Sequence, residues 1–160
     1  MTDPELYEAD FYAWTKVQAD RLRRLQAERA NLDLDLPHLA EEVEDLGKSE
    51  RNALHSQLRR IIEHCLKLEW SPATDPRNVW MASVVDARAE AEQLVSPTLL
   101  HDASAYLPKL YEQARRMAVL GLASHDEDNA ILRLPSECPY TLDRLLADDW
   151  YPTNRHGVPD

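Results

Sequence analysis

Apolar residues recur every three or four positions along most of the chain, which is the spacing of one face of an α-helix. The first row starts after Pro4, a residue that fits the first turn of a helix. Its members are Phe11, Trp14, Leu22 and Leu25, with Gln18 as the one polar interruption. This row predicts a first helix over about residues 4–29.

A longer row follows a short connector, in which Asp35 can cap a helix that begins at Leu36. Its apolar positions are Leu39, Val43, Leu46, Leu54, Leu58, Ile61, Cys65 and Leu68. Gly47 lies inside the row, where a glycine costs about 1 kcal/mol relative to alanine. Because the period continues across Gly47, we expect one long bent helix over residues 36–69. The alternative is a break at this glycine, with Ser49 capping a new helix.

Two more rows follow the linker at residues 71–76, where Asp75 and Pro76 repeat the signal of a cap followed by proline. The third row contains Trp80, Val84, Ala87, Ala91 and Leu94. The fourth contains Ala103, Leu107, Leu110, Ala114 and Met117. We expect the third helix to end near Pro97 and the fourth to begin near Asp102. Pro108 should bend its first turn or mark its true start.

The periodic pattern fades after Leu122. Thr141 can cap a short helix that continues through Leu146, and residues 150–160 have the character of a tail. Only three glycines and one phenylalanine occur in the 160 residues, and helix-forming residues outnumber β-branched ones.

Taken together, these patterns predict an all-α protein. The expected architecture is an antiparallel up-and-down bundle of four main helices, with the short C-terminal helix packed across it. The length suits a single domain over residues 1–160. The bundle would occupy about residues 4–123, the C-terminal loop and short helix 124–150, and the tail 151–160.

Charge and hydropathy narrow the range of partners. A net charge of −11 argues against nucleic acid, because Lys and Arg side chains that neutralise phosphates supply most of that affinity. No apolar stretch approaches the length of a membrane span, and the first residues lack the basic start and apolar run of a signal peptide. We therefore expect a cytoplasmic protein without a membrane partner. Cys65 and Cys138 show no metal-site or disulfide spacing, so both should be reduced thiols.

Several segments resemble the signature blocks of a bacterial family known as domain of unknown function 29. They are residues 10–15 (DFYAWT), residues 39–50 (LAEEVEDLGKSE), residues 138–141 (CPYT), His64 and Lys67 before Trp70, Trp80 with Arg88, and Tyr111 with Ala114 and Arg115. The resemblance runs in order from Asp10 to Trp150. One departure is the pair Leu68 and Glu69, which separates the lysine from the tryptophan. The resemblance implies a helical fold in a prokaryotic cytoplasm and no assigned activity.

The strongest metal candidate is the set His38, Glu42 and Asp45, which lie at positions i, i+4 and i+7 on one helical face. An imidazole and two carboxylates at this spacing can bind a divalent metal. A simpler interpretation is that acidic residues in the first turns offset the positive end of the helix dipole. Di-metal helical bundles also use Glu-x-x-His pairs on two helices, and no such pair occurs in this sequence.

Two tryptophans are candidates for an interface. Trp70 and Trp150 lie at the edges of predicted helices, whereas Trp14 and Trp80 lie on apolar rows and should be core.

No catalytic constellation is assembled by the sequence, and no cofactor is expected. The leading hypothesis is therefore a non-catalytic helical interaction module of the bacterial cytoplasm, which binds a partner protein or another copy of itself. The first alternative is a metal-dependent enzyme that uses His38, Glu42 and Asp45. The second is an acidic regulator, such as an antitoxin, that binds a basic protein.

Overall fold

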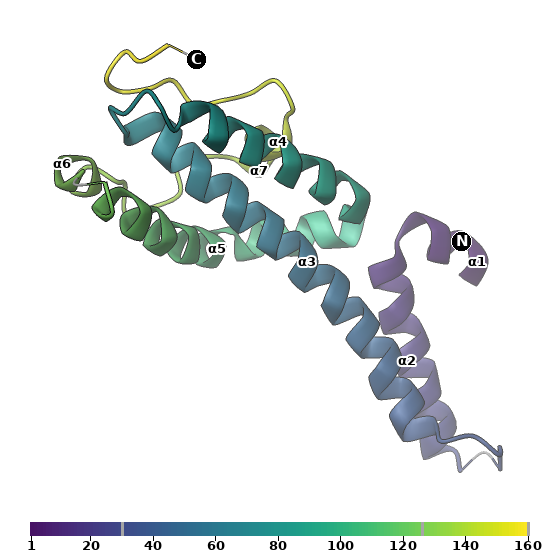
Figure 1. Cartoon of the computed structure of the whole chain (residues 1–160). Coiled ribbons are helices and arrows are strands. Elements are labelled where there is room, and N and C mark those ends of the chain that lie inside the picture. Colours follow the sequence, from purple (N-terminus) through teal and green to yellow (C-terminus); the bar gives the residue numbers. More distant parts are fainter. Residues whose placement is uncertain (30, 126, 160) are drawn as a thin grey trace. The chain divides into compact units, whose positions relative to one another are not determined.

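The computed structural model describes residues 1–29, 31–125 and 127–159, and every regular element within these ranges is a helix (Figure 1). The helices are α1 (Asp3–Ala9), α2 (Phe11–Ala27), α3 (Leu36–Trp70), α4 (Arg77–Leu94), α5 (Pro97–Ala123), α6 (Asp128–Ile131) and α7 (Leu142–Leu146). The predicted all-α class is therefore confirmed. None of the described helices combines the length and apolar character that crossing a membrane requires.

The chain divides into two compact units. The first unit contains Met1–Ala53 and Leu94–Asp102, and the second contains Leu54–Gln93 and Ala103–Asp160. The single four-helix bundle and its predicted boundaries stay predictions. Asp160, the last residue of the predicted tail, lies outside the described residues.

In the first unit, the predicted helix over residues 4–29 is wrong at Asp10, where the chain forms two helices instead. The backbone of Asp10 is not helical, with φ −154° and ψ 81°, and its carboxylate accepts the N–H of Ala13 at 2.9 Å, which starts α2. The same carboxylate accepts the N–H of Thr98 at 2.8 Å and the hydroxyl of Ser96 at 3.0 Å. Asp10 thus ends one helix, caps the next and holds the first turn of α5.

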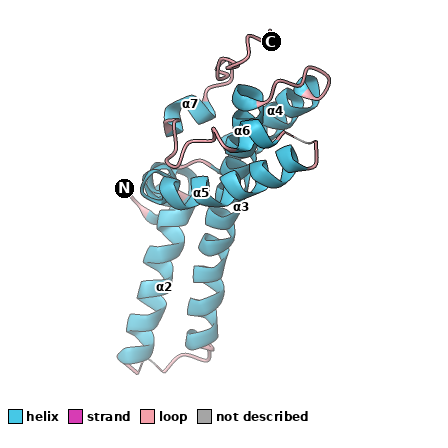
Figure 2. Cartoon of the chain, turned by 90° about the vertical axis from the view of Figure 1, so that its left-hand side faces the viewer, coloured by secondary structure: helices cyan, strands magenta, loops and turns pink. Residues whose placement is uncertain are grey.

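The first half of α3 runs antiparallel to α2, and together they form a helical hairpin (Figure 2). Tyr12, Thr15 and Ala19 are the buried residues of α2. A Cβ atom added at Gly47 of α3 would lie 2.2 Å from Oγ1 of Thr15, closer than real Cβ atoms come. Gly47 therefore permits a close helix contact and does not break α3, so the prediction of one long helix is confirmed.

Helix α5 begins earlier than the sequence pattern predicts. Pro97 occupies its first position, and the Ser96 hydroxyl oxygen accepts the N–H of Leu99 at 3.3 Å. Proline has no N–H, so it fits the first turn of a helix, where that group would be unpaired. Pro108 lies within α5 and is not its start, which corrects the expectation of a start near Asp102.

The second unit is built on the C-terminal half of α3 with α4 and α5. Its largest fully buried side chains are Leu54, Leu58, Ile61, Ile62, Leu66, Leu68, Val84, Leu110, Tyr111, Leu122 and Leu145. Polar contacts join the helices at the edge of this core. Arg60 of α3 donates to the hydroxyl of Ser83 in α4 at 2.9 Å, and Arg59 donates to Gln113 in α5 at 3.2 Å.

Arg88 of α4 holds the short helix α7 and the residues that follow it. Its buried guanidinium donates to the carbonyl oxygens of Leu145 at 2.9 Å and Trp150 at 2.7 Å. The Thr141 side chain caps α7 by accepting the N–H of Arg144, as the sequence predicted. The single turn of α6 was not predicted, and no side chain caps its start.

Candidate functional site

Residues 150–159 lie within the predicted tail, but they form a C-terminal strap that is docked against the end of α3. The side-chain amide of Asn154 donates to the carbonyl oxygens of Leu68 and Ser71, each at 2.8 Å. The backbone N–H of Arg155 donates to the carbonyl of Glu69 at 2.8 Å. The last four carbonyls of a helix have no partner within it. The strap therefore caps α3 from a distant part of the sequence.

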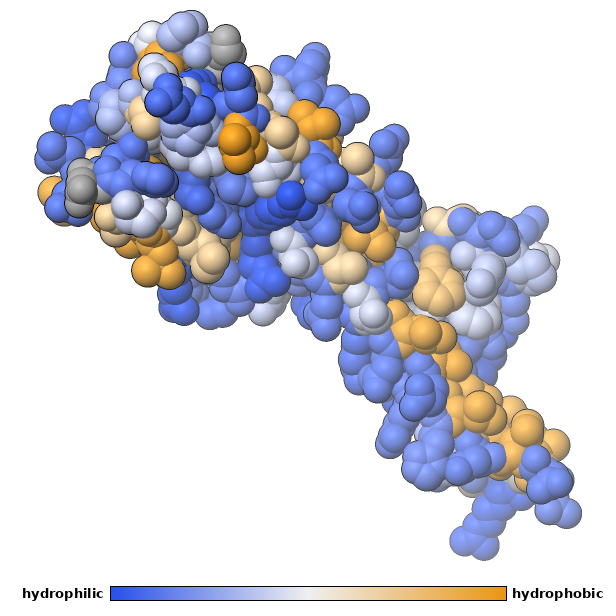
Figure 3. Space-filling view, viewed as in Figure 1, coloured by the Kyte–Doolittle hydropathy of each residue, from blue (hydrophilic) through white to orange (hydrophobic). Residues whose placement is uncertain are grey.

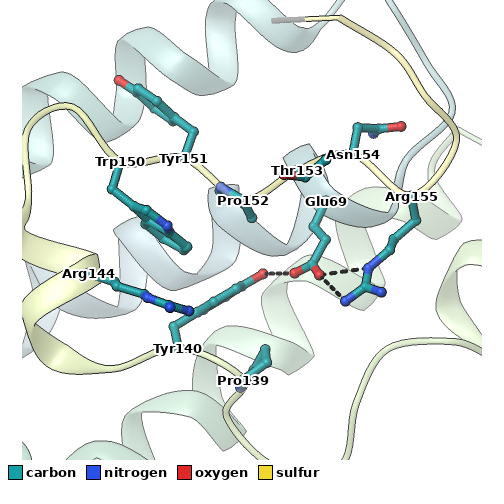
Figure 4. Close-up of a pocket in the computed structure, with 10 residues that line it drawn as sticks. All are labelled: Glu69, Pro139, Tyr140, Arg144, Trp150, Tyr151, Pro152, Thr153, Asn154 and Arg155. Atoms are coloured by element: carbon teal, nitrogen blue, oxygen red, sulfur yellow. Dashed lines mark hydrogen bonds and ion pairs between the residues drawn. The ribbon is translucent and has the colours of Figure 1, made fainter.

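Glu69 is the charged centre of this region, with only 5% of its surface exposed. Its carboxylate accepts the hydroxyl of Tyr140 at 2.6 Å and is paired with the guanidinium of Arg155 at 2.8 Å (Figure 4). Burial, reinforced by the hydrogen bond to Glu69, raises the pKa of Tyr140. The phenol thus stays protonated and remains a donor. Arg155 and Tyr140 together compensate the buried carboxylate.

A pocket of about 450 Å³ opens beside this cluster. Its lining residues are Glu69, Pro139, Tyr140, Arg144, Trp150, Tyr151, Pro152, Thr153, Asn154 and Arg155 (Figure 4). The rings of Tyr140 and Trp150 meet edge to face, with centroids 5.5 Å apart. The Arg144 guanidinium lies 6.0 Å from the centroid of the Trp150 ring. The pocket therefore combines the half-buried Trp150 ring with two exposed guanidinium groups, of which that of Arg155 is paired with Glu69.

The structure places both predicted interface tryptophans at the strap. Trp150 is half-buried and lines the pocket. Trp70 is half-buried as well, and Arg155 lies over its ring at 5.0 Å from the centroid. Trp150 thus begins the strap, and Trp70 lies against the Arg155 side chain of the same segment. Their role in an interface stays a prediction.

The predicted metal-binding residues His38, Glu42 and Asp45 are all exposed on α3. Nδ1 of His38 lies 2.6 Å from the carboxylate of Asp35, and Asp45 accepts a hydrogen bond from Lys48 at 2.9 Å. The hydrogen bond and charge of Asp35 raise the pKa of His38, which favours the imidazolium, a form that cannot bind a metal. Over residues 1–29, 31–125 and 127–159, no three His, Cys, Asp or Glu side chains are grouped to hold a metal ion. The metal hypothesis stays a prediction, to be tested in solution.

A second candidate surface lies on the α2–α3 hairpin. Leu39 and Leu46 of α3 are 39% and 52% exposed. Leu32 and Leu34 in the connecting loop are also exposed, and Leu22, Leu25 and Val43 are half-buried. Hydrophobic residues run along the hairpin between hydrophilic borders (Figure 3). We call these seven residues the hairpin face.

Sequence reasoning missed four residues of the strap region, namely Glu69, Tyr140, Arg144 and Arg155. One signal was available for Glu69, because it stands four positions after Cys65, where the apolar row of α3 should continue. An acidic side chain at such a position needs buried partners. Its partners Tyr140 and Arg155 lie 71 and 86 residues further along the chain, so no pattern near Glu69 could identify them.

The described helices define an all-helical protein, with its C-terminal strap docked against the end of α3. The chain belongs to the family described as domain of unknown function DUF29, whose model matches residues 6–151. It is similar to a crystal structure of an alpha-helical protein of unknown function from Rhodospirillum rubrum, with 30% sequence identity and a TM-score of 0.76 over 90% of each chain. Among curated proteins, none matches.

Proposed function

We propose that the chain is a non-enzymatic interaction module that pairs with a second copy of itself through the hairpin face. The observation that carries this proposal is the exposure of Leu39 and Leu46 on one side of α3. Isolated exposed leucines are common, but a contiguous exposed apolar patch on a soluble protein is typical of an interaction site.

Helical geometry supports a single continuous face. At about 100° per residue, Leu39, Val43 and Leu46 fall within about 60° of one another around α3. Leu22 and Leu25 fall within a similar sector of α2. The ion pair between Arg23 and Glu44 joins the helices on one side of their contact, and the leucines project from the other side. Both helices therefore contribute to the same apolar side of the hairpin.

Charge complementarity favours a second copy as the occupant. Beyond the leucines, the exposed surface of α2 carries Arg21 and Arg24, whereas the beginning of α3 carries Glu42 and Asp45. A two-fold axis parallel to the helices would place α2 of one copy against α3 of the other. This arrangement sets basic borders against acidic ones on both sides of a four-helix core, as in antiparallel bundles.

A bacterial cytoplasmic location is part of this proposal. Cys65 and Cys138 are both free thiols, which suits a reducing compartment. Neither the partner nor the compartment is indicated by the relative from Rhodospirillum rubrum, which is described only as alpha-helical and of unknown function.

Light scattering after size exclusion, over a wide range of protein concentrations, tests the proposal. We expect a dimer for the unmodified chain and a monomer for the double variant Leu39→Ser, Leu46→Ser, with unchanged helical circular dichroism. The matched control is Val79→Ser, Leu120→Ser, which removes two apolar side chains that are 69% and 66% exposed in the second unit. The control should remain dimeric. A monomeric unmodified chain, or a dimeric Leu39→Ser, Leu46→Ser variant, would overturn the proposal.

A further inference from the structure

We infer that the pocket between α7 and the C-terminal strap binds a small aromatic carboxylate, with Arg144 as the anchor for its charge. This site is in the second unit, whereas the hairpin face is in the first, and it does not depend on the proposed self-association. Its volume of about 450 Å³ falls within the range of small-molecule sites, which is roughly 300–1,000 Å³.

The charges around the pocket leave one cation uncompensated. Glu69 and Arg155 neutralise each other through an ion pair at 2.8 Å. The guanidinium of Arg144 makes no hydrogen bond or ion pair with any side chain in the part of the chain that the structure describes, and it lies 6.0 Å from the centroid of the Trp150 ring. Its sequence neighbour Asp143 is exposed and does not line the pocket. An anion can therefore bind Arg144 without displacing a carboxylate.

The walls favour a flat ligand. The half-buried Trp150 ring presents an aromatic surface to the pocket, and the exposed Pro139 adds rigid apolar surface, whereas Tyr140 and Pro152 are buried behind them (Figure 4). A planar ring can pack against these groups with little loss of conformational entropy. The ligand is thus expected to carry its charge at one end and an aromatic ring at the other.

A carboxylate fits better than a phosphate. The planar guanidinium can donate two parallel hydrogen bonds to a carboxylate, and a single positive charge matches a monoanion. A phosphate group would bring additional negative charge close to Glu69, and Arg155 is already occupied by that carboxylate. Discrimination against inorganic phosphate should follow from these charges.

Nuclear magnetic resonance of the full chain tests this inference, with benzoate as the probe and the indole N–H of Trp150 as the reporter. The Trp70 indole does not line the pocket and serves as an internal reference. We expect benzoate to shift the Trp150 signal in a saturable way and to leave Trp70 in place. Benzamide retains the ring without the charge, and acetate retains the charge without the ring, so each should bind at least tenfold more weakly. Inorganic phosphate should also bind more weakly than benzoate.

Arg144→Gln should weaken benzoate binding by at least tenfold, because a hydrogen bond to a charged group is lost. The fold should survive, since the Arg144 side chain is exposed and the backbone N–H at position 144 can still donate to the Thr141 hydroxyl oxygen. Arg133→Gln removes another exposed arginine that does not line the pocket, and this control should bind as the unmodified chain does. The inference is overturned if benzoate fails to shift Trp150, if Arg144→Gln binds it equally well, or if benzamide, acetate or phosphate matches benzoate.

Discussion

The carboxylate of Asp10 accepts the backbone N–H of Thr98 at 2.8 Å, although the two residues are 88 positions apart. Its other oxygen accepts the N–H of Ala13 at 2.9 Å. One buried carboxylate therefore caps the first turns of both α2 and α5 within the first unit. The stability of this unit should therefore depend on Asp10.

Replacing Asp10 by alanine should lower the free energy of unfolding by about 2 kcal/mol, since each lost cap costs about 1 kcal/mol. Urea denaturation followed by circular dichroism measures this change. Glu8→Ala is the matched control, because Glu8 is exposed and precedes the same helix start. Equal stabilities for the two variants would contradict the double-cap role of Asp10.

The same carboxylate predicts a pH dependence. Burial raises the pKa of Asp10, but the hydrogen bonds from Ala13, Thr98 and Ser96 outweigh it, so the pKa is lowered overall. A lowered pKa in the folded state contributes stability that is present above the unfolded value of about 3.9 and is lost as the pH falls through the folded value. The stability difference between the unmodified chain and Asp10→Asn should therefore shrink below about pH 4. Urea denaturation at pH 6 and at pH 3 would show this, and a difference that grows at low pH would rule it out.

Gly47 and Thr15 should be energetically coupled. A methyl group at position 47 would meet the Thr15 hydroxyl at 2.2 Å, and overpacking of this kind costs about 1–3 kcal/mol. Gly47→Ala should therefore destabilise the chain, although alanine favours a helix. In a Thr15→Ala background, the same substitution should cost markedly less.

A double-mutant cycle by urea denaturation measures the coupling of Gly47 and Thr15. Ser49→Ala, at an exposed position of α3, is the control and should have little effect. Additive effects of Gly47→Ala and Thr15→Ala would show that the Thr15 side chain is not what opposes a methyl group at position 47.

The metal hypothesis has a direct thermal test. Each of His38, Glu42 and Asp45 is exposed, and His38 and Asp45 already have protein partners. We therefore expect the Tm to stay the same in chelator and in Mn²⁺, Mg²⁺, Ca²⁺ or Zn²⁺. Binding at a hundred times the Kd would add about 2.7 kcal/mol to the stability. A clear rise in Tm with one metal, abolished by Glu42→Gln, would instead establish the predicted site.

Cys65 should resist thiol reagents in the folded protein. It is fully buried, and burial raises its pKa to about 12, so at pH 8 only about one molecule in ten thousand carries the thiolate. With Cys138→Ser removing the half-buried thiol, colour development with a disulfide reagent should begin only after urea is added. Rapid labelling of this variant under native conditions would show that the core of the second unit opens readily.

Periodicity and local capping signals predicted much of the helical structure. The long α3, the start of α4 after Pro76 and the short α7 with its cap at Thr141 all follow from signals within a few residues. The starts of α2 and α5 were missed for different reasons. Asp10 directly precedes the apolar row that starts at Phe11, so the pattern gave no sign of a break there. Ser96 and Pro97 precede α5, but its regular apolar row begins only at Ala103.

The apolar row of α3 was thus determined by the sequence alone, since Leu39, Leu46, Leu58 and Cys65 share one helical period. Their burial was not, because Leu58 and Cys65 are fully buried whereas Leu39 and Leu46 are exposed. The buried carboxylate of Glu69 is likewise compensated only by Tyr140 and Arg155, which the folded chain brings next to it. Helical periodicity depends on neighbours three and four residues away, and burial and charge pairing depend on which distant segments pack against that face.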